Sequence, residues 1–177
     1  MKVLALVAAL VSLGGCASMT QSPVTGNRAT AELRNASGQV VGMATFTQTD
    51  GGVLIVVEAK GLPPGPKGVH IHEVGKCEPP QFTTAGGHFN PGQKQHGSMN
   101  PQGPHAGDLP NMTVAQDGTG RMETTTDRVT LNAGATSLFD SDGSALVVHA
   151  GPDDFMTDPT GNSGGRSLCG VVTKPAS

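Results

Sequence analysis

The stretch QVVGMATFTQTDGGVLIVVEA, residues 39–59, decides the fold class. Its two halves, 39–48 and 53–59, are rich in β-branched and apolar residues, which favour strands. Between them stands Asp50-Gly51-Gly52, which is typical of a tight turn. The stretch therefore predicts two strands that are joined by a turn.

The same pattern continues on both sides of this stretch. Further strands are predicted over 30–35, 69–73, 112–115, 121–125, 145–149 and 168–173, with a weaker one over 129–131. The run GLPPGPKG (61–68) is not helical and ends the strand before it. No helical period runs longer than two turns. We therefore predict one all-β domain, an antiparallel sandwich or barrel, with a first long loop over 75–111 and a second over 151–165.

The composition of the 177 residues, which is the size of one domain, excludes some functions. The chain has no Trp or Tyr and only five Phe, so it offers few rings on which bases could stack. Its formal net charge is −3, so no broad basic surface is available to a nucleic acid. We expect no nucleic-acid partner.

The first residues have the pattern of an export signal. Lys2 precedes an apolar run (3–11) that is too short to span a bilayer, which predicts a secretory signal over 1–15. Its end, Leu13-Gly14-Gly15-Cys16, resembles the box at which bacterial lipoproteins are cleaved and lipidated on the cysteine. The alternative is an ordinary signal with a chance cysteine.

These residues lead to a prediction of domains and location. We expect a lipidated Cys16 and a flexible spacer over 16–29, followed by the domain over 30–177. Because Ala17 rather than Asp follows Cys16, the resemblance to lipoproteins implies the outer membrane. We thus expect a protein of the periplasm or cell envelope with a lipid anchor in the membrane.

Two cysteines remain if Cys16 carries lipid. Export would place Cys77 and Cys169 in an oxidising compartment, in which a disulfide persists. We predict that they form one disulfide. The alternative is two buried free thiols.

All six histidines lie beyond residue 69, outside helix-like stretches. His70 and His72 are two positions apart in a predicted strand, so they face the same side, about 6.6 Å apart along the chain. His149 ends another predicted strand and can join them from there. Three or four imidazoles at the lip of a sheet suit copper, zinc or iron.

The first loop has a second set of candidate ligands. His96, His105 and Asp108 lie there together with His88. Nitrogen ligands with one carboxylate are typical of a tetrahedral zinc site, and a metal would explain what holds so long a loop in place. The alternative for any one of these histidines is a surface or hydrogen-bonded residue.

Six separated motifs follow one another along the chain. They are VHIHEVG (69–75), GGHFNP (86–91), KQHG (94–97), PHAGDLPN (104–111), LVVH (146–149) and GNSGGRSLCG (161–170). In these motifs and their order the chain resembles copper/zinc superoxide dismutases, in particular the bacterial, exported branch. The resemblance covers about residues 31–172, and it implies an immunoglobulin-like, antiparallel Greek-key sandwich or flattened barrel with two long functional loops.

The resemblance implies two metal sites that share one ligand. The implied copper ligands are His70, His72, His88 and His149. The implied zinc ligands are His88, His96, His105 and Asp108. His88 would thus be a bridging imidazolate, and Cys77–Cys169 matches the family disulfide. Asp153 matches a carboxylate that links a copper-site histidine to a zinc-site histidine, although the neighbouring Asp154 leaves that assignment open.

The implied reaction is the disproportionation of superoxide to oxygen and hydrogen peroxide. In the family's mechanism His88 takes up a proton and supplies it to the second superoxide. Arg166 matches the guanidinium that attracts and orients this anion. The second loop departs from eukaryotic members because it is short and acidic, with Pro159 in place of a Lys. Lys94 and Lys76 are therefore weak further candidates for steering the substrate.

Two other interpretations remain open. One is a copper- or zinc-binding envelope lipoprotein on the same fold without turnover, and the other is a structural envelope protein with incidental histidines. The enzyme is favoured because all seven ligand positions and Arg166 are present. The sequence leaves open whether the protein is a monomer or a homodimer.

Overall fold

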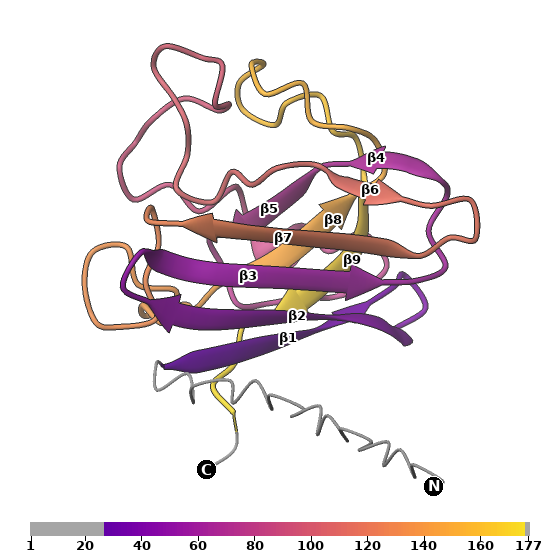
Figure 1. Cartoon of the computed structure of the whole chain (residues 1–177), viewed down its shortest axis with the longest axis horizontal. Coiled ribbons are helices and arrows are strands. Elements are labelled where there is room, and N and C mark those ends of the chain that lie inside the picture. Colours follow the sequence, from indigo (N-terminus) through magenta and orange to yellow (C-terminus); the bar gives the residue numbers. More distant parts are fainter. Residues whose placement is uncertain (1–26, 176–177) are drawn as a thin grey trace, which may run out of the picture.

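The structure is a computed structural model that describes residues 27–175 (Figure 1). The predicted signal (1–15), Cys16 and the spacer as far as residue 26 lie outside the described residues. The described part contains one helical segment, the single 3-10 turn η1 (Thr83–Ala85). None of its helices is long and apolar enough to cross a membrane.

Nine strands form one antiparallel sheet. In chain order they are β1 (Arg28–Arg34), β2 (Val40–Thr49), β3 (Gly52–Ala59), β4 (Gly65–Lys67), β5 (Val69–His72), β6 (Met112–Val114), β7 (Gly120–Thr126), β8 (Ala145–His149) and β9 (Arg166–Val171). Across the sheet the order is β4-β6-β7-β3-β2-β1-β9-β8-β5. Strands from the two ends of the described chain, β1 and β9, are therefore neighbours.

The sheet nearly closes into a flattened barrel. Its edge strands, β4 and β5, are separated in the chain by Gly68 alone, so the chain passes directly from one edge to the other. The amide of Gly68 donates to the carbonyl of Gly151, and its own carbonyl accepts the N–H of His149, both at 2.8 Å. Figure 1 shows β1, β2, β3 and β7 as one layer, with β5, β8 and β9 crossing behind it. The predicted all-β fold is confirmed.

The apolar core follows from the alternation of side chains along the strands. In β3, Val53, Ile55 and Val57 are fully buried, whereas the residues between them are partly exposed. Their register with β2 sets Ile55 opposite Phe46, which is also fully buried. Each such side chain stabilises the fold by about 1.5–3 kcal/mol through burial.

One strand was missed, and two predictions were wrong. The run 61–68 contains β4, which tolerates Pro66 because an edge strand pairs on one side only. The weak strand over 129–131 is absent, and Thr130 instead makes an isolated bridge to Ser137. β1 begins at Arg28, inside the predicted spacer (16–29), because Arg28 pairs with Thr47 of β2.

Candidate metal centre

The strand β5 has side chains buried on both faces, which places the first histidines. Val69 and Ile71 pack into the apolar core, so the alternation directs His70 and His72 to the opposite face. On the neighbouring strand β8, His149 lies on this same outer face. The first and second loops lie near each other at the top of Figure 1. The three imidazoles are buried.

The first loop brings His88 to this face by pairing with β5. His72 and His88 form an isolated antiparallel bridge. The amide of Phe89 donates to the carbonyl of Ile71 at 2.8 Å, and the Phe89 side chain is buried in the core. Gly107 packs against the same Ile71 carbonyl so closely that a Cβ atom there would not fit.

Four imidazoles converge on one point. The facing nitrogens of His70, His72, His88 and His149 all lie within 4.8 Å of one another. The buried atoms that lack a hydrogen-bond partner include one nitrogen of each ring, namely His70 Nδ1, His72 Nε2, His88 Nε2 and His149 Nε2. An unpaired buried polar atom costs about 1–3 kcal/mol. Four of them at one place fit a metal ion that accepts their lone pairs.

The opposite nitrogens of all four rings have partners, and that of His88 is described with the second cluster below. His72 Nδ1 lies 2.9 Å from the carbonyl oxygen of Gly86, and His149 Nδ1 lies 3.1 Å from that of Gly164. His70 Nε2 lies 2.7 Å from a carboxylate oxygen, Oδ2 of Asp153. These acceptors hold the ring protons and so leave the lone pairs on the unpaired nitrogens, as in known metal sites.

A second cluster surrounds Asp108. Its Oδ1 lies 3.0 Å from Nδ1 of both His88 and His96, and 3.3 Å from Nδ1 of His105. Its Oδ2 accepts the backbone N–H groups of Gly97 at 2.9 Å and of His105 at 3.0 Å, which orients the carboxylate. Three imidazole nitrogens and one carboxylate oxygen fit a tetrahedral zinc ion.

His70 also lies close to this second cluster. A group of donors within 4.8 Å of one another joins it to His88, His96 and Asp108 and leaves out His105. However, His70 Nε2 is bound to Asp153, and its Nδ1 belongs to the four unpaired nitrogens. His105 Nδ1, by contrast, lies 3.4 Å from His88 Nδ1. His105 therefore fits the second cluster better than His70 does.

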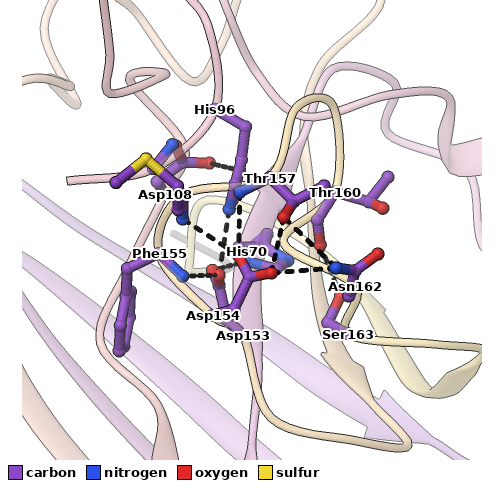
Figure 2. Close-up of polar contacts among 12 residues, drawn as sticks. His70, His96, Asp108, Asp153, Asp154, Phe155, Thr157, Thr160, Asn162 and Ser163 are labelled. Carbon is purple, nitrogen blue, oxygen red and sulfur yellow. Dashed lines mark hydrogen bonds and ion pairs between the residues drawn. The ribbon is translucent and has the colours of Figure 1, made fainter. Parts of the chain in front are cut away.

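Asp153 connects the two clusters, as Figure 2 shows. Its Oδ2 lies 2.7 Å from His70 Nε2, and its Oδ1 lies 3.0 Å from His96 Nε2. Asp154 instead binds within its own loop, accepting the backbone N–H of Thr157 at 2.8 Å and the side-chain amide of Asn162 at 2.9 Å. Of the two neighbouring aspartates, Asp153 is thus the one that links the histidines.

Arg166 lies at the mouth of the first cluster. A pocket of about 490 Å³ is lined by residues that include His72, His88, His149 and Arg166. Arg166 donates from Nη1 to the carbonyl of Phe82 and from Nη2 to that of Gly86, both at 2.6 Å. Within the described residues Arg166 is the one cation that lines this pocket, and neither Lys76 nor Lys94 reaches it.

A disulfide joins β9, which begins at Arg166, to the first loop, whose carbonyls hold the Arg166 side chain. Cys77, in the first loop, is bonded to Cys169 of β9, which confirms the predicted pair. Phe82, whose carbonyl holds Arg166, is buried against Ala85 and Cys169 on the outer face of the sheet. The disulfide therefore ties the first loop to the strand that bears the guanidinium.

Comparison with known proteins decides the family. Residues 40–172 match the family model described as copper/zinc superoxide dismutase. The chain belongs to this family. A "Superoxide dismutase [Cu-Zn] 2" of Aquifex aeolicus is 51% identical over 147 residues, which cover 82% of this chain and 86% of the relative. A copper/zinc superoxide dismutase of Deinococcus radiodurans is 41% identical and covers 96% of this chain and 94% of the relative.

Solved structures agree with this assignment. A superoxide dismutase-like protein from Bacillus subtilis shares 40% sequence identity with a TM-score of 0.78, over 81% of this chain and 97% of that one. The copper/zinc superoxide dismutase family uses copper and zinc as cofactors and superoxide as substrate, and these apply to this chain. The donor set described above fits both metals.

The electrostatics of the superoxide dismutase site favour neutral imidazoles in the first cluster. Burial lowers the pKa of His70 and, further, that of His72. Burial also lowers the pKa of His88 to about 4 and that of His149 to about 3. At neutral pH these rings are therefore uncharged and keep a lone pair for a metal.

The second cluster of the dismutase site is more polar. Burial alone would lower the pKa of His96, but hydrogen bonds to Asp108 and Asp153 outweigh it and raise that pKa to about 9. Burial would raise the pKa of Asp108, but the hydrogen bonds from His105, His88 and His96 outweigh it and hold that pKa well below its usual range. Without metal, a protonated His96 between two carboxylates supplies the positive charge that a bound metal ion would bring.

Sequence reasoning missed several groups that position the ligands. The carbonyls of Gly86 and Gly164 have no sequence signal, since every residue has a carbonyl. Asn111 lies in a motif noted above, and its side chain exchanges two hydrogen bonds of 2.9 Å with the backbone of Asp153. Asp158, seen only as part of an acidic loop, contacts the backbone of His96.

Proposed function

We propose that this copper/zinc superoxide dismutase converts two superoxide ions and two protons to oxygen and hydrogen peroxide at adjoining copper and zinc sites. The proposed copper ligands are His70, His72, His88 and His149. The proposed zinc ligands are His88, His96, His105 and Asp108. The observation that carries the proposal is the set of four buried, unpaired imidazole nitrogens beside a pocket that Arg166 lines.

Bound copper supplies one-electron redox chemistry, whereas bound zinc, which has none, holds its ligands in place. The remaining work falls to the side chains. Arg166 keeps its charge despite its partial burial, because a guanidinium is not deprotonated in proteins. Two of its N–H groups are engaged by the Phe82 and Gly86 carbonyls, and the rest remain to bind an anion in the pocket.

We assign the bridging role to His88. Its Nδ1 faces Asp108 at 3.0 Å, and its Nε2 is the unpaired atom on the copper side. His88 would therefore be a ligand of both metals, through Nδ1 and through Nε2. In the proposed reaction, His88 Nε2 would be the atom that holds one proton and gives it to the second superoxide.

We also propose that the protein is exported and anchored in the cell envelope through lipid on Cys16. The signal-like residues 1–15 and the lipobox-like Leu13-Gly14-Gly15-Cys16 support this location. The Cys77–Cys169 disulfide is consistent with it, since disulfides persist in oxidising compartments.

In cell fractionation, the wild-type protein is expected in the membrane fraction and a Cys16→Ala variant outside it. A Cys16→Ala variant that still partitions with membranes would contradict the anchor.

The test of the activity is superoxide turnover by purified protein loaded with copper and zinc, beside a His149→Ala variant. Rapid turnover that disappears in the variant supports the enzyme and the copper assignment together. Copper and zinc bound in a one-to-one ratio without turnover would instead support a metal-binding protein. Absence of metal binding would leave the histidines with only a structural role.

A further inference from the structure

We propose that Asp158 is a positioning residue of the zinc site, which holds His96 and His105 from outside the set of ligands. The inference rests on the proposed assignment of these two histidines to zinc. Asp158 belongs to the second loop, whereas both histidines belong to the first. It therefore acts between two segments that are far apart in the chain.

The contact with His96 is a hydrogen bond to the backbone. Asp158 Oδ1 accepts the N–H of His96 at 2.6 Å across 62 residues of sequence. Hydrogen bonds to an ionised carboxylate are shorter and about twice as strong as neutral ones. Because Asp153 already holds the ring of His96 at Nε2, His96 is held at two points, its ring by Asp153 and its backbone by Asp158.

The contact with His105 is electrostatic. The same Asp158 Oδ1 lies 3.7 Å from His105 Nε2, which is longer than a hydrogen bond. His105 Nδ1 points the other way, to Asp108 at 3.3 Å. A neutral ring that offers Nδ1 to a metal carries its proton on Nε2, on the side of Asp158. The negative charge of Asp158 lies on the side of that proton and attracts it, which favours this orientation of the ring.

The two contacts of Asp158 contribute unequally to holding the histidines. The side chain of Asp158 is 45% exposed, so water and salt screen its charge towards His105. The hydrogen bond to the His96 amide depends on geometry and is less affected by screening. We therefore expect the hydrogen bond to contribute more than the charge.

Asp154 provides a matched control in the same loop. It accepts hydrogen bonds from Met156, Thr157 and Asn162 and so stabilises the turn of the second loop (Figure 2). Within residues 27–175, none of the partners of its side chain is a metal-ligand candidate. Its substitution tests whether any change in the loop affects zinc as much as the loss of Asp158 does.

The experiment measures zinc affinity of the purified full-length protein by competition with a chelator. The variants are Asp158→Ala, Asp158→Asn and Asp154→Ala, each with copper bound. Asp158→Ala is expected to bind zinc about 10-fold more weakly or worse, as is usual when a partner of a ligand is removed. Asp158→Asn keeps an oxygen for the His96 amide but lacks the charge, so it is expected to lose less. Asp154→Ala is expected to match the wild type.

Cobalt(II) in the zinc site gives a second measurement that does not depend on turnover. Its visible spectrum is expected to change in Asp158→Ala, while the electron paramagnetic resonance of copper(II) stays the same, because Asp158 has no recorded contact with His70, His72 or His149. Unchanged zinc affinity and cobalt spectrum in both Asp158 variants would overturn the inference alone. An equal loss in Asp154→Ala would also overturn it, since the loop fold would then be the cause. A wild-type protein that binds no zinc would overturn the underlying zinc site.

Discussion

His72 and Arg166 donate hydrogen bonds to the same carbonyl oxygen, that of Gly86. His72 Nδ1 lies 2.9 Å from it, and Arg166 Nη2 lies 2.6 Å from it. One backbone group therefore sets both the proton position of a proposed copper ligand and the position of the guanidinium that we propose binds the substrate. The metal site and the anion site are built on a common support.

This arrangement predicts that Arg166 can be removed without loss of copper. In Arg166→Ala, the contact between His72 and Gly86 remains, so copper content is expected to stay as in the wild type. The value of kcat/KM is expected to fall by at least about 10-fold, because the focused positive charge is lost. Arg121→Ala is a control of equal charge, since Arg121 is an exposed residue paired with Glu58 and Glu123. An equal fall in both variants would contradict a specific role for Arg166.

Attraction of the substrate by Arg166 also predicts that the turnover rate depends on salt concentration. Superoxide is an anion, and the field of Arg166 is screened as ionic strength rises. The wild-type rate is expected to fall from low to physiological ionic strength, with a smaller change in Arg166→Ala. A wild-type rate that is flat or rises over this range would show that the protein exerts no net attraction on the substrate.

The link through Asp153 predicts a joint effect on both metals. Asp153→Asn keeps the shape of the side chain but weakens its contacts with His70 and His96. Affinity for copper and for zinc is each expected to fall by about 10- to 100-fold. Dialysis against a chelator followed by metal analysis measures this, with Asp154→Asn as the control. Loss of one metal alone would contradict a link between the two clusters.

The pKa shifts predict a maximum in the stability of the metal-free protein near pH 6.5. The lowered pKa values of His88 and His149, about 4 and about 3, make the folded state bind fewer protons than the unfolded state. Their contribution is present above pH 6.5 and is lost as the pH falls towards these values. The raised pKa of His96, about 9, acts in the opposite direction, and its contribution is lost as the pH rises towards 9.

Thermal unfolding with chelator between pH 4 and 9 measures this profile. In His96→Gln the decline on the alkaline side is expected to disappear, because the residue with the raised pKa is absent. Zinc is expected to flatten the same side in the wild type, since it replaces the proton of His96. A stability that rises steadily from pH 6.5 to 9 without metal would contradict the assignment.

The disulfide predicts a large loss of stability on its removal. Cys77 and Cys169 are 92 positions apart, and closing a loop of that length stabilises the folded state by roughly 4–5 kcal/mol in the chain-entropy model. The double variant Cys77→Ser, Cys169→Ser is expected to show this loss in urea unfolding without metal. It is also expected to lose activity, because the support of Arg166 is loosened. Equal unfolding midpoints in the variant and the wild type would contradict the prediction.

Much of the fold could be predicted because strand signals are local. The β-branched, apolar run 53–59 predicts a strand, and β3 lies there. Which face of it is buried was not predicted, because residues 53–57 are all apolar. β4 was missed because its prolines are turn-forming residues, and only the proximity of β6 makes Gly65–Lys67 a strand. The prediction of a weak strand at 129–131 was wrong for the opposite reason. The residues there favour a strand, but they pair with the rest of the chain only through the isolated bridge from Thr130 to Ser137.

The sequence by itself determined the candidates for the chemistry. They are six histidines, Asp108 and Arg166 in ordered motifs, with His70 and His72 on one face because strand geometry has a period of two. Tertiary structure decided how these groups are used. It brought Asp153 and not Asp154 to the histidines, and it placed Asp158 against His96. It also directed one nitrogen of each ring in the first cluster toward a common point. Such contacts join loops far apart in the chain, so they depend on how the closed barrel packs those loops together and not on local residue preferences.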